Sequence, residues 1–271
     1  MLAQFGDEAG VYAGGTELLL AMRSGALRYT QLIDVKVIAG LDSIELRADH
    51  LEIGAGATHR VIERSRLVRQ KLPVLAEMES HVANIRVRAS GTIGGNLCFA
   101  EPHSDPATLL LALGAKVEVE GPEGRRELGV EELIEGAYAN SLRPSELLTK
   151  LRVPVASPGL RAAYLKFQVH ERPTLGLALA METAEGGQLI KNARVALGCL
   201  CPFPRRSEAA ESMLTGSSEA VKNRLPDAAL ALAQEAELID DQEGAVDYKT
   251  HLIEVFLRRA FLKALGAEHN F

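Results

Sequence analysis

The sequence contains no tryptophan, and aromatic residues make up only 4% of its 271 positions. A chain with so few flat rings offers little surface on which unpaired bases can stack, so single-stranded nucleic acid is not an expected ligand. Basic residues are dispersed among acids, and the formal net charge of -6 provides no basic face for duplex DNA. We therefore expect no nucleic-acid partner.

Long apolar runs are also absent. The longest one, Leu109 to Leu113 with its flanks, is far too short to span a bilayer. Met1 is followed by neither the basic segment nor the apolar stretch of a secretory signal. We expect no membrane insertion and a cytoplasmic location.

Cysteine is scarce. Its three residues, Cys98, Cys199 and Cys201, form no Cys-x-x-Cys pair, which argues against a disulfide scaffold and against an iron–sulfur or zinc site. His59 and His103 each lack a second histidine or cysteine at metal-ligand spacing. We expect no bound metal, and we expect these histidines to be solvated or to cap helices.

Hydrophobic residues make up 47% of the chain, enough for a sizeable core and for two domains. The first half alternates short strands and helices, and the second half has three strands followed by helices. We place the boundary near residues 156–160, which gives domains at 1–155 and 160–266. The expected strands are 11–13, 32–35, 51–57, 116–120, 146–155, 164–168, 175–183 and 193–200, with a hairpin turn at 185–188.

Three helices have recognisable limits in the sequence. Thr58 stands where it can cap a helix running from His59 to Leu67. Pro226 can occupy the first turn of an alanine-rich helix that continues to Leu238. A later apolar stripe ends at Gly266.

Two glycine-rich turns are the most distinctive local feature. The first loop is Ala13 to Glu17 and the second loop is Thr92 to Asn96. Glycine lets backbone N–H groups approach an anion closely, and the hydroxyl of Thr16 adds a donor. Neither loop ends in Gly-Lys-Ser/Thr or has G-x-G-x-x-G spacing. The pair predicts a two-loop diphosphate cradle that uses backbone amides rather than a lysine, whereas each loop alone is also typical of an ordinary tight turn.

Three charged residues near the second loop allow two interpretations each. Asp105 precedes Pro106, which suits a helix cap, and its carboxylate can also accept hydrogen bonds from ligand hydroxyls such as a ribityl chain. Arg86 and Arg88 fit either a phosphate contact or a solvated strand edge.

Taken together, these motifs resemble the flavin-binding medium subunit of the molybdenum hydroxylases, a family that includes bacterial carbon monoxide dehydrogenase and xanthine dehydrogenase. The resemblance covers nearly the whole chain. It implies an α+β fold, with a two-lobed FAD-binding domain of the vanillyl-alcohol oxidase (PCMH) type that is short at its N-terminus. A small C-terminal domain with a three-stranded antiparallel sheet and helices follows. The segments that carry the resemblance are residues 13–18, 54–58, 89–97, 104–105, 193–198 and 204–206.

The resemblance also implies a set of FAD contacts. The first loop would wrap the diphosphate, the second would form the facing wall, Ala83 and Asn84 would lie along the flavin, and Asp105 would reach the ribityl or diphosphate region. The implied FAD-binding residues are Ala13, Gly14, Gly15, Thr16, Glu17, Ala83, Asn84, Thr92, Ile93, Gly94, Gly95, Asn96 and Asp105. No residue is expected to act as a catalytic acid, base or nucleophile.

The function implied by the resemblance is electron transfer within a larger enzyme. FAD would receive electrons through a [2Fe–2S] small subunit from a molybdopterin-containing large subunit, and NAD, a quinone or oxygen would take them up. The implied assembly is a heterohexamer, a dimer of heterotrimers. One alternative is a stand-alone FAD oxidase or reductase on the same fold, for which Glu101, His103 and Tyr138 are the candidate acids or bases. A second alternative is a scaffold subunit without flavin.

Overall fold

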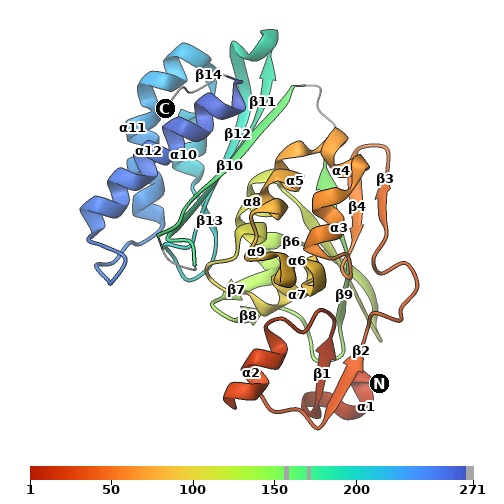
Figure 1. Cartoon of the computed structure of the whole chain (residues 1–271). Coiled ribbons are helices and arrows are strands. Elements are labelled where there is room, and N and C mark those ends of the chain that lie inside the picture. Colours follow the sequence, from red (N-terminus) through yellow and green to blue (C-terminus); the bar gives the residue numbers. More distant parts are fainter. Residues whose placement is uncertain (156–158, 170–171, 267–271) are drawn as a thin grey trace. The chain divides into compact units, whose positions relative to one another are not determined.

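The computed structural model describes residues 1–155, 159–169 and 172–266, which form two compact units. The first unit comprises residues 1–101 and 114–154, and the second comprises residues 102–113 together with the chain from 155 onward (Figure 1). Residues 102–113 thus fold with the second unit although they interrupt the first in sequence. Of the expected boundary at residues 156–160, positions 156–158 lie outside the described residues.

The first unit opens with a small N-terminal lobe, residues 1–38. Its two strands, β1 and β2, run parallel, with Gly10 opposite Leu32. The elements of the lobe are α1 (Leu2–Phe5), η1 (Gly6–Glu8), β1 (Ala9–Tyr12), α2 (Leu18–Ser24) and β2 (Gln31–Asp34). The first loop therefore connects β1 to α2.

The larger part of the first unit is an antiparallel sheet in the order β3-β4-β9-β5-β6, with helices gathered over one face (Figure 1). Its strands are β3 (Ile44–Leu46), β4 (His50–Gly54), β5 (Lys116–Gly121), β6 (Gly124–Gly129) and β9 (Leu147–Pro154). The remaining elements are α3 (His59–Arg64), α4 (Arg66–Lys71), α5 (Pro73–Ser80), α6 (Ile85–Ser90), α7 (Ile93–Phe99), α9 (Val130–Leu133), β7 (Ile134–Gly136) and β8 (Ala139–Asn140).

The two faces of this sheet differ in chemistry because side chains alternate along a strand. Leu51 and Ile53 are buried in the core. Glu52, between them, pairs instead with Lys150 on the neighbouring strand at 2.9 Å. The alternation places the helix-covered core on one side and a network of ion pairs on the other.

The second unit is built on three long antiparallel strands, which confirms the expected architecture. They are β10 (Leu160–Phe167), β11 (Leu175–Ala184) and β12 (Leu189–Gly198), and the short strands β13 (Arg205–Arg206) and β14 (Gly216–Ser217) pair with β12. The expected turn between β11 and β12 is η2 (Glu185–Gly187), where Gly186 and Gly187 both have positive φ. The helices are α8 (Asp105–Leu113), α10 (Glu208–Met213), α11 (Ser218–Glu235) and α12 (Val246–Ala264).

Both faces of the central strand β11 are covered. Leu177 and Leu179 belong to the core formed with α11 and α12. On the other face small residues allow α8 to approach closely, since a Cβ at Gly198 would lie 2.0 Å from Oγ1 of Thr108. Gly198 pairs with Gly176 across the strands, so two glycines share that face.

Two helix predictions are wrong, and serine capping explains both. The helix expected from His59 to Leu67 is broken at Ser65, whose hydroxyl accepts a hydrogen bond from the N–H of Val68 and starts α4. Helix α11 begins upstream of Pro226, because Ser217 caps it by accepting from the N–H of Ala220 at 3.3 Å. A serine cap satisfies helix-terminal donors that a proline cannot satisfy.

Glu146, just before β9, makes the first unit sensitive to acid. Its carboxylate accepts two bonds from Arg126, from Nε at 2.8 Å and Nη2 at 2.6 Å, and one from the N–H of Arg143 at 2.8 Å. The hydrogen bonds from Arg126 are the main reason that the pKa of Glu146 falls from 4.5 to about 2.

Glu146→Gln is expected to remove part of the acid lability. A carboxyl whose pKa is lower in the folded state stabilises the fold above its unfolded value, and that contribution is lost as pH falls from 4.5 toward 2. The Arg126 side chain is 31% exposed, so solvent screening reduces this contribution to about 1 kcal/mol. Urea midpoints measured across this pH window should fall less steeply for the variant. Parallel profiles for the two proteins would contradict the expectation.

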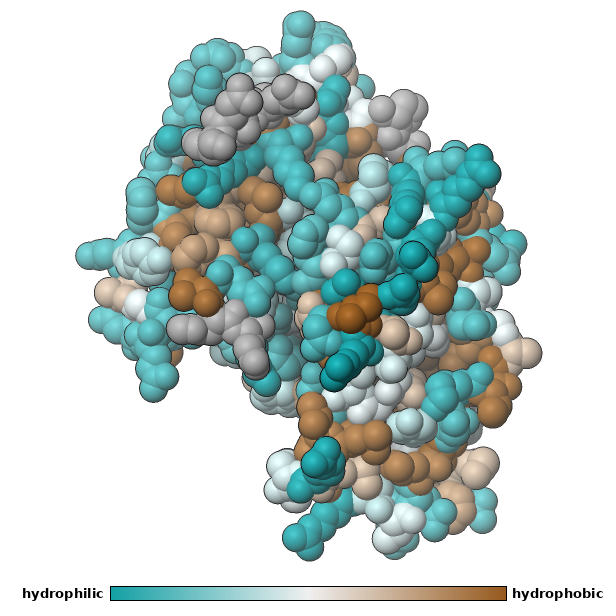
Figure 2. Space-filling model, viewed as in Figure 1, coloured by the Kyte–Doolittle hydropathy of each residue, from teal (hydrophilic) through white to brown (hydrophobic). Residues whose placement is uncertain are grey.

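The surface of the N-terminal lobe is unusually apolar (Figure 2). Val37 is 83% exposed and Leu20 is 58% exposed, and Leu19 and Leu32 also lie at the surface. No helix in the described part of the chain combines the length and the hydropathy needed to cross a membrane.

Candidate functional site

The structure brings the two glycine loops together within the first unit. A Cβ at Gly14 would lie only 2.2 Å from the carbonyl oxygen of Ser90 and 2.8 Å from Cα of Gly91. The backbone of the first loop therefore rests directly against the residues that lead into the second. Glycine is required at position 14 by this contact between loops.

The first loop holds backbone donors that the protein itself does not use. Gly15 adopts a left-handed conformation, with φ of 69°, and its carbonyl accepts from the N–H of Leu19 at 3.1 Å. The N–H groups of Gly14, Gly15 and Thr16 find no acceptor in the described ranges of the chain. Half-buried N–H groups without partners are suited to binding an anion.

The second loop is the capped first turn of α7 rather than an ordinary tight turn, and it uses its amides internally. The N–H of Ile93 donates to the carbonyl of Ala57 at 3.0 Å, and the N–H of Gly94 donates to the carbonyl of Ala55 at 2.9 Å. Oγ1 of Thr92 caps α7 by accepting from the N–H of Gly95 at 3.1 Å. This loop is thus suited to forming a wall, while the unused donors lie on the first loop.

The two adjacent glycines of the second loop have different surroundings. A Cβ at Gly94 would lie 2.6 Å from Cβ of Ala55, so this buried glycine is required for packing. Gly95 is exposed, and a Cβ there would meet only Oγ1 of Thr92, at 2.8 Å. Its open side is the kind of surface to which a ligand can come close to the backbone.

Lys36 is a cation beside the first loop that the sequence interpretation did not include. Its Nζ donates to the carbonyl of Ala13 at 3.1 Å, pairs with Asp34 at 3.1 Å and lies 3.8 Å from the ring centroid of Tyr12. Only its position just after β2 distinguishes it in the sequence. The cradle therefore has a neighbouring positive charge in addition to its amides.

Ala83 and Asn84 lie at the exposed start of α6. Ala83 has a positive φ of 40°, which is uncommon for a residue with a side chain. Asn84 caps the helix, since its Oδ1 accepts from the N–H of Arg86 at 2.9 Å. Their predicted position along the flavin stays a prediction.

Arg86 and Arg88 lie on this helix, so the strand-edge interpretation is wrong. Arg88 pairs with Glu63 on α3 at 3.2 Å and donates to the carbonyl of Val82 at 3.0 Å. These bonds connect α6 to α3 and to the segment before α6, so Arg88 has a structural role.

Asp105 lies in the second unit, where it is 4% exposed. It is the first residue of α8 itself, and its carboxylate accepts from the hydroxyl of Tyr164 at 2.5 Å and from Nζ of Lys166 at 2.9 Å. The capping interpretation is therefore wrong, because side chains from β10 use the carboxylate. Burial raises the pKa of Tyr164, which keeps its hydroxyl a donor.

His59 is neither solvated nor a helix cap, contrary to expectation. Thr58 caps α3, as predicted, while His59 is 2% exposed and its Nδ1 lies 2.6 Å from Oε2 of Glu79. Its backbone N–H donates to the carbonyl of Gly91 at 3.1 Å. The partner stands twenty positions away on α5, so no local sequence signal indicates this pair.

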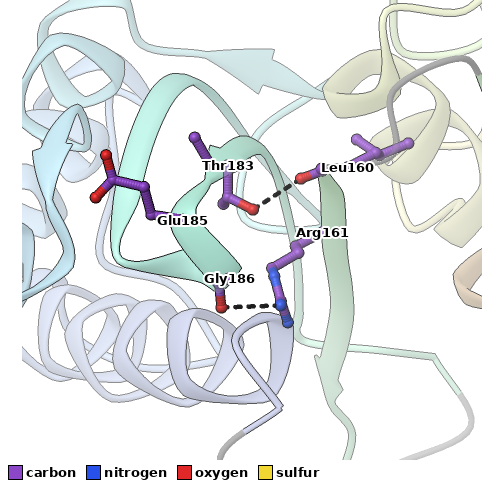
Figure 3. A pocket seen from close by; sticks show the side chains of 7 residues that line it. Leu160, Arg161, Thr183, Glu185 and Gly186 are labelled. Atoms are coloured by element: carbon purple, nitrogen blue, oxygen red, sulfur yellow. Dashed lines mark hydrogen bonds between the residues drawn. The ribbon is translucent and has the colours of Figure 1, made fainter.

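A separate cavity of about 390 Å³ lies in the second unit, at the β11–β12 turn (Figure 3). Its one cationic side chain, Arg161, donates to the carbonyls of Gly186 and Leu265. Thr183 likewise bonds to the carbonyl of Gly159. These polar groups hydrogen-bond to the backbone around the turn, so we assign them a structural role and assign the cavity no ligand.

Family models match both parts of the chain. The FAD binding domain in molybdopterin dehydrogenase matches residues 1–156, and the CO dehydrogenase flavoprotein C-terminal domain matches residues 164–264. The chain is 32% identical to the carbon monoxide dehydrogenase medium chain of Afipia carboxidovorans, over 100% of this chain and 93% of the relative. It is 25% identical to the xanthine dehydrogenase FAD-binding subunit of Escherichia coli O157:H7, over 96% and 90%.

Solved structures agree with this similarity. A chain of carbon monoxide dehydrogenase from Hydrogenophaga pseudoflava, in a form lacking the Mo-pyranopterin moiety, superposes with a TM-score of 0.89 at 32% identity, covering 98% of this chain and 92% of the other. A chain of quinoline 2-oxidoreductase from Pseudomonas putida 86 also gives a TM-score of 0.89, at 26% identity, covering 99% and 93%.

Proposed function

This chain belongs to the family of FAD-binding medium subunits of molybdenum hydroxylases, and from that premise we propose that its two glycine loops hold the diphosphate of FAD in an electron-transfer subunit. In this proposal, electrons released by hydroxylation at a molybdopterin-containing large subunit reach the flavin through a [2Fe–2S] small subunit. NAD, a quinone or oxygen then accepts them. The proposed assembly is a dimer of heterotrimers.

The observation that carries the proposal is that the first loop has unused N–H donors, whereas the second loop uses its amides internally. Unused N–H groups at Gly14, Gly15 and Thr16 lie on the loop that touches Ser90 and Gly91, and the open backbone of Gly95 follows four residues later in the chain. Donors on one side and a side chain-free wall on the other fit a diphosphate, which needs hydrogen bonds and close approach. Lys36 adds positive charge at the first loop.

The bound FAD would supply the redox chemistry, because an isoalloxazine both accepts and releases electrons. The residues of this chain would bind and orient it, which requires no nucleophile or general base. Of the candidate acids and bases, Glu101 and Tyr138 form a hydrogen bond of 3.4 Å with each other in an exposed position. The apolar surface of the N-terminal lobe supports docking of a partner subunit.

Co-expression with the partner subunits tests the proposal. The chain should copurify with a molybdopterin subunit and a [2Fe–2S] subunit, show flavin absorbance and gain substrate-driven flavin reduction. The mass of the complex should equal two copies of each subunit. Expressed alone, the chain should bind FAD weakly or aggregate, and NADH-dependent dye reduction should be slow at most.

Two outcomes would count against this function. A monomeric, fully flavinated chain that oxidises an organic substrate unaided would favour the stand-alone oxidase. A complex that assembles without flavin absorbance would favour the scaffold.

A further inference from the structure

The buried pair His59–Glu79 lies directly behind the point where the two loops meet. The side chains of His59 and Glu79 are 3% and 0% exposed, and Nδ1 and Oε2 are 2.6 Å apart. Oε1 of Glu79 is buried and has no hydrogen-bond partner among the residues that the structure describes. A buried carboxylate with one oxygen unpaired is costly, so an arrangement that depends on this single bond calls for an explanation beyond packing.

The imidazole presents its other edge to the cradle. A Cβ at Gly91 would lie 3.1 Å from Cδ2 of His59 and 3.3 Å from Oγ1 of Thr16. The carbonyl oxygen of Val87 would lie nearer still, at 2.9 Å, so the ring edge, this carbonyl and the hydroxyl of the first loop all border the open side of Gly91. Nε2 is bonded to Cδ2 and therefore lies on this same edge.

Nε2 is also the nitrogen that remains available. It makes no hydrogen bond within the portion of the chain that the structure describes. It is also not one of the fully buried polar atoms that lack a partner, so it is not closed off from a ligand. On α6, which also contacts α3, Arg88 is paired with Glu63. The hydrogen bond to Glu79 orients the ring, and Nε2 is left for a ligand.

We propose that His59 is a cofactor-positioning residue whose Nε2–H donates to the diphosphate of FAD, while its Nδ1–H donates to Glu79. In the FAD-bound protein both ring nitrogens carry protons, and the imidazolium lies between the carboxylate and the diphosphate. A carboxylate on one ring nitrogen fixes the orientation and tautomer of the ring and so directs the other nitrogen. This inference rests on the proposed FAD site and adds to it a buried cation behind the loops.

Two amide substitutions separate the roles of the two nitrogens. In His59→Asn the amide nitrogen can replace Nδ1 and keep the bond to Glu79, but nothing replaces Nε2. In His59→Gln the amide can replace Nε2, but the bond to Glu79 is lost. We expect His59→Asn to weaken FAD binding about tenfold to a hundredfold, as for loss of a hydrogen bond to a charged group, with little change in apo stability. His59→Gln should show the reverse pattern, with lower apo stability and nearly normal affinity.

The ring nitrogens can be observed directly by ¹⁵N NMR of histidine-labelled protein, with His59→Asn to assign the signals. Addition of FAD should move the His59 Nε2 resonance to the range of a protonated nitrogen. An unprotonated Nε2 in the FAD-bound protein, or equal FAD affinity in His59→Asn and wild type, would overturn the inference while leaving the FAD site intact. Absence of FAD binding by the wild-type chain in its assembled complex would overturn the proposed function as well.

Discussion

Gly95→Val should fold normally and lose FAD. Gly95 is exposed, and a Cβ there would meet Oγ1 of Thr92 at 2.8 Å, so the change requires a shift of this capping hydroxyl, at a cost of about 1 kcal/mol. A branched side chain would occupy the open side of the second loop, where the diphosphate approaches the backbone in the proposed FAD site. Circular dichroism should match wild type, and flavin absorbance should be absent.

The adjacent glycine provides the matched control. A Cβ at Gly94 would lie 2.6 Å from Cβ of Ala55 and 2.7 Å from its carbonyl oxygen. Gly94→Val should therefore destabilise the first unit itself, and overpacking of this kind typically costs about 1–3 kcal/mol. If Gly95→Val retained full flavin occupancy, the second loop would not be the wall of the FAD site.

Asp105→Ala should lower the stability of the apo protein by about 2 kcal/mol, since the buried hydroxyl of Tyr164 and the ammonium of Lys166 both lose this acceptor. The carboxylate is the acceptor for both Tyr164 and Lys166, and the Lys166 side chain is only 18% exposed. Urea unfolding of the apo protein measures the effect, monitored by the fluorescence of a dye attached to the second unit.

Tyr164→Phe is the control, because it removes one donor and leaves the ion pair in place, at an expected cost of about 1 kcal/mol. Asp105→Asn then examines the predicted contact with FAD. It should weaken FAD binding beyond the change in apo stability if the carboxylate also binds the cofactor. An Asp105→Ala protein as stable as wild type would show that β10 does not depend on this carboxylate.

Local signals were sufficient for most of the secondary structure. The three long strands of the second unit, the glycine turn at η2 and the Thr58 cap depend on residues close in sequence. The predicted limits of a helix were wrong where two local signals competed. At Pro226 the proline preference for a first helical turn lost to the cap at Ser217.

The candidate site shows a similar division. The glycine loops were recognisable because close backbone contact requires glycine in any context, and Gly14 meets Ser90 in this way. The partners of His59 and Asp105 were not recognisable. Glu79 is twenty positions from His59, and Tyr164 is fifty-nine positions from Asp105, so each pair exists only after distant elements pack. Lys36 likewise gains its position beside Ala13 from the pairing of β1 with β2.

The placement of α8 restricts how this protein can be divided or recombined. All nine residues of the helix are buried, and it packs against β11 and β12. A fragment that starts at residue 164, where the C-terminal family match begins, omits it and leaves those strands uncovered. During synthesis the helix leaves the ribosome well before the sheet that receives it. Exchange of second units between relatives would therefore have to carry residues 102–113 along with the C-terminal half.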